Sequence, residues 1–294
     1  MVKNIGWIGT GVMGSSMAGH LQKAGYQLFV YNRSKEKTQA LVSNGAIFCE
    51  SPAKVAEQSD IVFTIVGYPK DVEDVYFSER GIFKRISKGK IVVDMTTSEP
   101  TLAKKIYDAA RSMGVHVLDA PVSGGDVGAR NATLAIMVGG DKETFDAVFP
   151  LFQKMGENIK LMGPAGAGQH TKMSNQILIA STMIGVVESL LYAYKAGLNL
   201  DEVIDVIGKG AASSWSINNL GRRIVQGNFD PGFFIKHFIK DMGIALAEAR
   251  KMNLSLPGLA LAQQFYIAAS SMGLENLGTH GLYLVFKKMN GISS

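Results

Sequence analysis

Six short apolar runs alternate with amphipathic segments along the first 160 residues, and this alternation constrains the fold of the chain most. The runs span residues 5–9, 27–32, 61–66, 90–95, 115–120 and 133–140. They are rich in valine and isoleucine and nearly continuously apolar, which is typical of strands buried on both faces of a parallel sheet. Amphipathic segments between them predict helices. We therefore expect repeated βαβ units and a doubly wound α/β sheet.

The pattern changes after Gly163, where the segment GPAGAGQH marks a break. Long helical patterns follow, with hardly any strand signal, over residues 171–197, 201–209, 213–226, 236–252 and 257–272. The sequence therefore predicts an α/β domain over 1–162 and an all-helical C-terminal domain over 163–294. We expect the last eight residues to be frayed.

Composition excludes several classes of protein. Hydrophobic residues make up 47% of the 294 residues, which is enough for two packed cores and excludes intrinsic disorder. The net charge of +5 is spread thinly, which suits a small anionic ligand better than a nucleic acid. Cys49 is the single cysteine and the five histidines lack metal-binding spacing, so we expect neither a disulfide framework nor a metal site.

One apolar stretch, residues 176–198, is long enough to resemble a membrane span. It carries Glu188 and Lys195, and a charge inside a bilayer costs several kcal/mol, so a long helix buried in protein is favoured. The first structural motif begins by residue 9, which leaves no room for a signal peptide. We expect a soluble, cytoplasmic protein that binds neither membranes nor nucleic acid.

The segment from Gly9 to Gly14 reads G-x-G-x-x-G, between a predicted strand and a predicted helix. In this context, Gly9 permits a tight turn, Gly11 admits a pyrophosphate close to the backbone, and Gly14 lets helix and strand pack closely. The helix N-terminus provides N–H donors to phosphate. We therefore predict a Rossmann-type dinucleotide site that also includes Val12 and Met13, against the alternative of an ordinary βα turn.

The end of the second predicted strand indicates which dinucleotide binds. NAD enzymes place Asp or Glu there for the ribose hydroxyls, whereas this chain has Asn32, Arg33 and Ser34. A carboxylate would repel a 2′-phosphate, and a guanidinium suits it. We predict NADP(H) rather than NAD(H). The alternative is that Arg33 is only a solvated surface charge.

Two later segments hold candidate substrate residues. In the first, Ser123 offers a hydroxyl, and Gly124 and Gly125 offer backbone N–H groups that favour a small carboxylate, unless the segment is a plain glycine turn. In the second, Lys172, Asn175 and Gln176 share one face of a predicted helix among apolar neighbours. A lysine there is out of place without a function or an anionic partner, although a surface lysine with a buried stem is the alternative.

Together these residues resemble the β-hydroxyacid dehydrogenases. This family includes 3-hydroxyisobutyrate dehydrogenase, tartronate semialdehyde reductase and the glyoxylate/succinic semialdehyde reductases. The resemblance covers nearly the whole chain and rests on motifs in the family's order: GWIGTGVMG (6–14), DMTTSEP (94–100), DAPVSGG (119–125), GAGQHTKMSNQ (166–176) and Lys240-Asp241. The chain departs from the family where Gln176 replaces a common asparagine.

The resemblance implies roles for individual residues. Lys172 is the catalytic acid/base, Asn175 orients the substrate, Thr97 lies near the nicotinamide, and Lys240 closes over both cofactor and substrate. Ser123, Gly124 and Gly125 hold the substrate carboxylate. Either Asn175 or Gln176 reaches the substrate. We expect Ser213, Trp215 and Phe234 to shape the substrate pocket.

The resemblance implies an NADPH-dependent reductase of small aldehyde acids such as glyoxylate, succinic semialdehyde or tartronate semialdehyde. The alternative is a 3-hydroxyisobutyrate-type dehydrogenase that works in the oxidative direction. Lys172 argues against an imine reductase, in which the lysine is typically replaced, and against a non-catalytic module. 6-Phosphogluconate dehydrogenase has a much longer helical half. We expect a homodimer or homotetramer built on the helical domain.

Overall fold

The computed structural model describes residues 2–292 and divides the chain into two compact units. The first unit ends at Lys172 and the second begins at Met173, whereas the sequence places the boundary at residue 162. The structural boundary lies inside a long helix, because backbone N–H groups of Gly166 and Gln169 donate to the Asp119 carboxylate in the first unit. The first turns of this helix therefore belong to the α/β unit.

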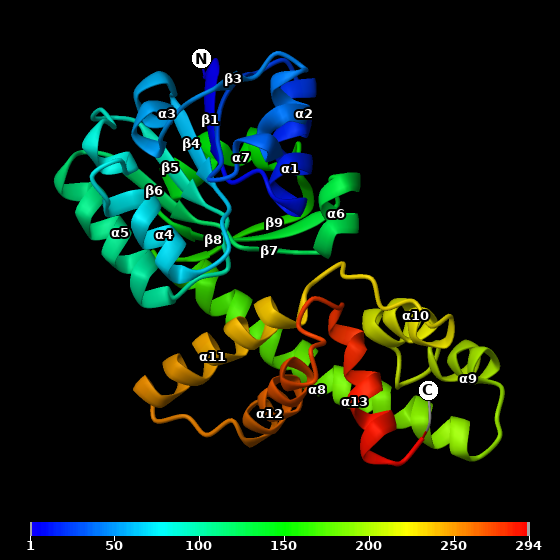
Figure 1. The fold of residues 1–294 in the computed structure, drawn as a ribbon. Coiled ribbons are helices and arrows are strands. Elements are labelled where there is room, and N and C mark those ends of the chain that lie inside the picture. The colour runs from blue at the N-terminus through cyan, green and yellow to red at the C-terminus, as the bar shows by residue number, and fades with distance from the viewer. Residues whose placement is uncertain (1, 293–294) are drawn as a thin grey trace. The chain divides into compact units, whose positions relative to one another are not determined.

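The first unit contains a sheet of nine strands among the described residues, in the order β3-β2-β1-β4-β5-β6-β8-β7, with β9 also paired to β8 (Figure 1). The strands are β1 (Asn4–Ile8), β2 (Gln27–Tyr31), β3 (Ile47–Phe48), β4 (Ile61–Thr64), β5 (Ile91–Asp94), β6 (His116–Asp119), β7 (Val122–Ser123), β8 (Leu134–Gly140) and β9 (Gly156–Gly163). The helices between them are α1 (Val12–Lys23), α2 (Gln39–Val42), α3 (Pro52–Gln58), α4 (Pro69–Phe77), α5 (Pro100–Ser112), α6 (Gly125–Asn131) and α7 (Lys142–Phe152).

Both faces of the sheet are covered, which explains why its central strands are apolar throughout. On one face, Trp7 and Phe63 stack with ring centroids 5.4 Å apart and pack with α1 and α7. On the other face, Ile8 and Val92 pack with α3, α4 and α5. Alternate residues of one strand therefore belong to different cores. The predicted Rossmann-type doubly wound sheet is confirmed.

The sheet is not parallel throughout, a feature that the apolar runs do not predict. Strand β8 runs antiparallel to β6 and β7. The chain turns back here because the connection from β6 to β8 is occupied by β7 and the seven-residue helix α6, leaving no room for a crossover helix that covers the sheet. Strands β3, β7 and β9 were not predicted. Two of them have two residues each, and β9 is mostly outside the core, so none has an apolar run as long as those of the predicted strands.

The second unit is helical, as predicted. Its helices are the remainder of α8 (Ala167–Lys195), α9 (Leu200–Ile207), a π-helical turn (Ser216–Gly221), α10 (Arg222–Val225), α11 (Ile235–Lys251), α12 (Pro257–Ser271) and α13 (Leu282–Met289). Buried side chains of α8, α11 and α12, such as Met183, Phe238 and Tyr266, form one core. The expected frayed tail is helical as far as Met289, and residues 293–294 lie outside the described residues.

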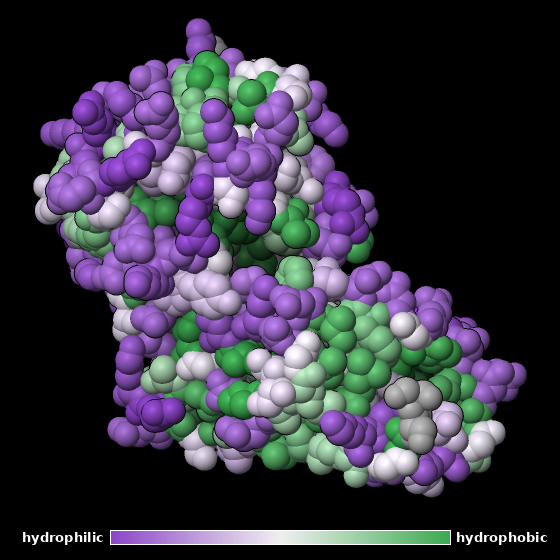
Figure 2. Space-filling model, in the orientation of Figure 1, coloured by the Kyte–Doolittle hydropathy of each residue, from purple (hydrophilic) through white to green (hydrophobic). Residues whose placement is uncertain are grey.

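Within the described residues, α8 is the one helix long and apolar enough to cross a bilayer, a test that core helices of soluble proteins also pass. Only 39% of its most apolar stretch is buried. Six of its exposed residues follow one stripe: Ser174, Leu178, Ser181, Gly185, Glu188 and Tyr192. Tyr194 and Lys195 at the end of the helix are exposed as well. Figure 2 shows further hydrophobic side chains gathered on the surface of the helical unit around α9, α10 and α13. Val206 of α9, Met289 of α13 and Trp215 before the π-helical turn are exposed.

Candidate active site

The glycine-rich loop between β1 and α1 has the geometry that its three glycines predict. Gly9 has a φ of +99°, and a Cβ there would overlap the carbonyl oxygen of Ile65. A Cβ on Gly14 would overlap the carbonyl oxygen of Gly9. A Cβ on Gly11 would meet no atom of residues 2–292 within 4 Å. Packing within the chain therefore explains why residues 9 and 14 are glycine. It does not explain Gly11, where the absence of a side chain leaves room for a ligand close to the backbone.

The N-terminus of α1 has the properties of an anion site. Within the part of the chain that the structure describes, no side chain caps this end of the helix, and its first turn holds no acidic residue. Val12 is exposed, whereas Met13 is partly buried against the core. The buried Thr10 hydroxyl has no hydrogen-bond partner among the described residues. The free backbone N–H groups at the start of α1 and the Thr10 hydroxyl therefore fit the pyrophosphate of a dinucleotide.

Asn32, predicted as a ribose contact, is engaged inside the protein. Its Oδ1 accepts a hydrogen bond from the backbone N–H of Thr10 at 3.0 Å, and its Nδ2 donates to the carbonyl of Ser34 at 2.9 Å. Asn32 thus fixes the glycine-rich loop to the end of β2. The Arg33 side chain is 87% exposed and pairs with Asp71 at 3.2 Å, and Ser34 is exposed. Arg33 and Ser34 are therefore on the surface, whereas Asn32 is half-buried.

Thr97 lies in the loop that follows β5, half-buried between the buried Thr96 and Ser98. Asp94, the last residue of β5, holds the start of this loop. Its Oδ1 accepts hydrogen bonds from the Thr64 hydroxyl at 2.8 Å and from the Thr96 N–H at 3.1 Å. Burial raises the pKa of Asp94 to about 6, although these donors oppose the shift. The Thr96 hydroxyl accepts from the Val66 N–H at 3.0 Å, which joins this loop to the one after β4.

The predicted carboxylate-binding loop turns from β7 into α6. Ser123 ends β7 and is half-buried, and Gly124 and Gly125 have φ values of +130° and +62°. These values favour glycine, so both residues are required by the turn itself. At the start of the same segment, Asp119 is buried, and burial raises the pKa of its carboxyl group.

Lys172 lies in the second turn of α8 and is buried, with 6% of its surface exposed. The turn before it is held by Asp119, which accepts from the Gly166 N–H at 2.7 Å and from the Gln169 N–H at 2.8 Å. The interpretation of Lys172 as a surface lysine is therefore excluded. A buried lysine at a fixed position suits transfer of a proton to substrate and, when charged, stabilisation of negative charge.

In the second unit, the remaining predicted residues form one chain of polar contacts. Asn175 Nδ2 donates to Gln176 Oε1 at 2.7 Å, and Gln176 Nε2 donates to Asp241 Oδ2 at 2.6 Å. Asp241 Oδ1 lies 3.0 Å from Lys240 Nζ. Gln176 is buried with 1% exposure, whereas Asn175 is half-buried. Both ends of the Gln176 amide are therefore used inside this unit, and Asn175 is the better placed of the two for a substrate.

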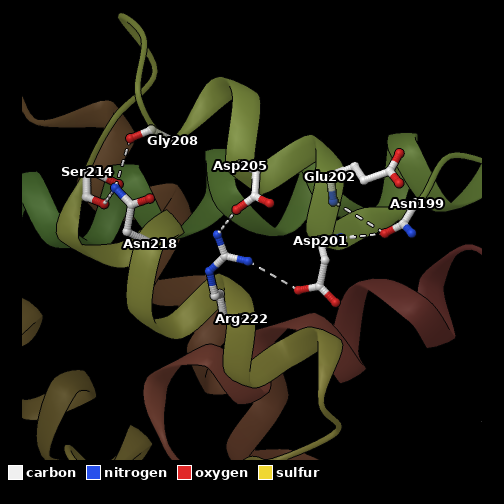
Figure 3. Close-up of polar contacts among 8 residues, drawn as sticks. All are labelled: Asn199, Asp201, Glu202, Asp205, Gly208, Ser214, Asn218 and Arg222. Carbon is white, nitrogen blue, oxygen red and sulfur yellow. Dashed lines mark hydrogen bonds and ion pairs between the residues drawn. The ribbon is translucent and has the colours of Figure 1, made fainter.

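The predicted pocket residues Ser213 and Trp215 lie just before the π-helical turn. Asn218 holds this segment, because its Nδ2 donates to the carbonyls of Gly208 and Ser214 at 3.0 and 3.1 Å (Figure 3). Figure 3 also shows Arg222 between Asp201 and Asp205, which ties α10 to α9. Trp215 is 63% exposed, and Phe234 caps the start of α11.

Sequence reasoning assigned no role to Asp94, Asp119 or Gln169. All three are buried, polar and bonded to loops that carry predicted site residues. Asp94 and Asp119 each end a strand in the same sheet, which is a signal the sequence contains. No group of three or more potential metal ligands occurs within residues 2–292.

Family models match most of the chain. The model of the NAD-binding domain of 6-phosphogluconate dehydrogenase matches residues 4–163, and the model described as NAD-binding of NADP-dependent 3-hydroxyisobutyrate dehydrogenase matches residues 166–286. The two matches meet close to the start of α8.

Several full-length relatives are similar. An uncharacterized oxidoreductase of Bacillus subtilis, YkwC, is 53% identical over 98% of this chain and 100% of its own. A probable 3-hydroxyisobutyrate dehydrogenase-like mitochondrial protein of Arabidopsis thaliana is 52% identical over 98% of this chain and 86% of its own. The 2-hydroxy-3-oxopropionate reductase of Escherichia coli is 40% identical over 97% of both chains.

The fold also matches a solved structure. The 3-hydroxyisobutyrate dehydrogenase of Mycobacterium tuberculosis with L-serine superposes with a TM-score of 0.89, at 27% identity over 98% of this chain and 100% of the other.

Proposed function

Because the chain belongs to the β-hydroxyacid dehydrogenase family, we propose that it is an NADPH-dependent reductase of small aldehyde acids. Family membership makes it an oxidoreductase that acts on hydroxyl groups. The proposal goes further in three respects: the reaction runs as a reduction, the cofactor is NADPH, and the substrate is a small aldehyde acid. Glyoxylate, succinic semialdehyde and tartronate semialdehyde are the candidate substrates. The observation that carries it is the buried Lys172 on a helix anchored by Asp119.

The residues of the chain have distinct tasks in this proposal. When bound, NADPH supplies the hydride. The Lys172 Nζ donates a proton to the oxygen of the substrate as negative charge develops there. Ser123 and the backbone N–H groups of Gly124 and Gly125 bind the carboxylate. We assign the orienting role to Asn175 because the Gln176 amide is occupied by Asn175 and Asp241.

The preference for NADPH rests on Arg33. Its exposed guanidinium follows β2 directly, where a dinucleotide enzyme recognises the adenosine ribose, and no carboxylate occupies residues 32–34. Asp71 lies beside Arg33 and partly neutralises it. Lys240, held by Asp241 in the second unit, is proposed to contact both cofactor and substrate.

A second candidate is oxidation of a 3-hydroxyisobutyrate-type acid. The match of residues 166–286 to a 3-hydroxyisobutyrate dehydrogenase model favours it. In that direction Lys172 must accept a proton, so oxidation is expected to improve at alkaline pH. An oxidation rate that stays flat from pH 6 to 10 would contradict the role of Lys172.

The decisive experiment is Lys172→Ala, assayed with NADPH and a panel of short aldehyde acids at 340 nm. We expect kcat to fall by at least ~10²-fold with NADPH binding retained, which is typical for loss of an acid/base group. Lys142→Ala is the matched control, because Lys142 is 74% exposed and forms a surface ion pair with Asp146 on α7. Unchanged turnover of the Lys172 variant would reject the proposal.

A further inference from the structure

Gln169 is a fully buried polar residue in the first turn of α8, three positions before Lys172. It has 0% exposure. Burying a carboxamide is costly unless its donor and acceptor are both satisfied. The two partners of this amide therefore indicate what the residue holds in place.

Both partners belong to the backbone on either side of Thr97. Gln169 Nε2 donates to the carbonyl of Thr96 at 2.7 Å, and Gln169 Oε1 accepts from the N–H of Ser98 at 2.9 Å. The side chain thus brackets a single residue of the loop after β5. Such a pair of bonds fixes both the position and the orientation of the loop backbone at Thr97.

The backbone of Gln169 is fixed as well. Its N–H donates to Asp119 Oδ2 at 2.8 Å, and Asp119 begins the loop that leads to Ser123. Gln169 therefore connects three segments of the α/β unit: the Thr97 loop, the end of β6 and the helix turn that precedes Lys172.

We propose that Gln169 is a positioning residue that fixes Thr97 relative to Lys172, and so aligns the nicotinamide-side loop with the proton donor. The proposal rests on the proposed function, because it takes Thr97 as a nicotinamide-side residue and Lys172 as the acid. Gln169 itself touches neither cofactor nor substrate in this account. It acts through the backbone of the loop.

Two variants of Gln169 distinguish the loss of both side-chain hydrogen bonds from the loss of one. Gln169→Met has a similar length and removes both bonds. Gln169→Glu keeps an acceptor for the Ser98 N–H but places a second oxygen against the Thr96 carbonyl. The matched control is Gln22→Met, because Gln22 Nε2 also donates to two backbone carbonyls, those of Leu41 and Asn44, at 3.1 and 2.8 Å on the α1–α2 side of the unit.

Three measurements test the proposal. Amide hydrogen exchange of the peptide that contains Ser98 reports whether the loop is held. NADPH affinity by fluorescence separates binding from chemistry. The primary isotope effect with 4-deuterated NADPH reports the alignment of hydride transfer. A misalignment near 1 Å is enough to reduce turnover ~10²-fold, so we expect both Gln169 variants to lose about 10- to 100-fold in kcat.

The expected result is faster exchange at Ser98 in Gln169→Met, reduced kcat with NADPH affinity within about threefold of wild type, an altered isotope effect, and a normal Gln22→Met control. Wild-type kcat and isotope effect in Gln169→Met would overturn the proposal. So would wild-type exchange at Ser98. If Gln169→Met does not fold, Gln169→Glu decides by the same readouts. A wild-type protein inactive on every aldehyde acid would reject the proposed function instead, while the exchange measurement, which needs no substrate, still decides whether Gln169 holds the loop.

Discussion

Replacing Asp119 by asparagine should destabilise the α/β unit, because its carboxylate accepts two buried backbone hydrogen bonds. The Gly166 N–H donates to Oδ1 at 2.7 Å, and the Gln169 N–H donates to Oδ2 at 2.8 Å. In Asp119→Asn one oxygen becomes an NH₂ group, so one of these N–H groups loses its acceptor and faces another donor. The surviving bond is no longer made to a charged group.

The size of the loss follows from these bonds. A hydrogen bond to a charged group contributes ~1.5–3 kcal/mol, and an unsatisfied buried N–H costs ~1–3 kcal/mol. Removing the buried charge offsets part of this loss, because burial raises the pKa of Asp119 and so disfavours its ionised form. We therefore expect the free energy of unfolding of this unit to fall by about 2–4 kcal/mol.

The assay must report on one unit, since a chain with two units does not unfold in one step by default. The chain has two tryptophans: Trp7, fully buried in the sheet, and Trp215, exposed in the helical unit. In a Trp215→Phe background, Trp7 fluorescence during urea unfolding follows the α/β unit alone. Asp146→Asn is the control, because Asp146 is 55% exposed and its pair with Lys142 is expected to contribute ~0.5 kcal/mol. A loss below about 0.5 kcal/mol in Asp119→Asn would refute the reasoning.

Three further predictions concern pH, cofactor and assembly. The pKa of Asp94 is about 6 in the folded protein, above its ordinary value of 3.8, so the folded state keeps a proton that the unfolded chain loses. The free energy of unfolding should therefore fall by about 2 kcal/mol as pH rises from about 4 to 6, and Asp94→Asn should remove this contribution in urea titrations at several pH values. Arg33→Ala should lower the kcat/KM preference for NADPH over NADH by about tenfold, whereas Asp71→Asn should raise it by freeing the guanidinium; a tenfold preference of wild type for NADH would contradict both. Leu178 is 70% exposed in the stripe on α8, and we propose that this stripe is an interface of a homodimer or homotetramer, so Leu178→Glu should lower the mass measured by light scattering. A wild-type mass of about 32 kDa at micromolar concentration would count against an oligomer.

The sequence predicts the parts of the fold that depend on periodicity. Ile8 and Val92 fall in continuous apolar runs because helices cover both faces of the sheet, and such runs are readable without a structure. Strand β9 was missed because it lies mostly outside the core and has no such run. The antiparallel turn at β8 was missed because it depends on a short connection rather than on composition.

The sequence singles out candidate site residues where glycine spacing, or a lysine among apolar residues on a predicted helix, provides the signal. Gly9 and Lys172 are of this kind. Gln169 was not assigned a role because its partners lie about 70 residues away in the chain, beside Thr97. Asn32 was assigned to the cofactor because its position matches the ribose-binding residue, although its amide is bonded to Thr10 and Ser34.

Asn32 uses its amide oxygen and its amide nitrogen for different bonds, so a substitution can keep the first and change the second. Aspartate at this position would retain the oxygen that receives the Thr10 N–H, but its second oxygen would face the Ser34 carbonyl that Asn32 now donates to. The carboxylate that NADH-dependent enzymes use could thus be introduced with the bond between the glycine turn and β2 intact. A change of coenzyme preference at this position is therefore expected to leave the Thr10 bond of the glycine turn in place.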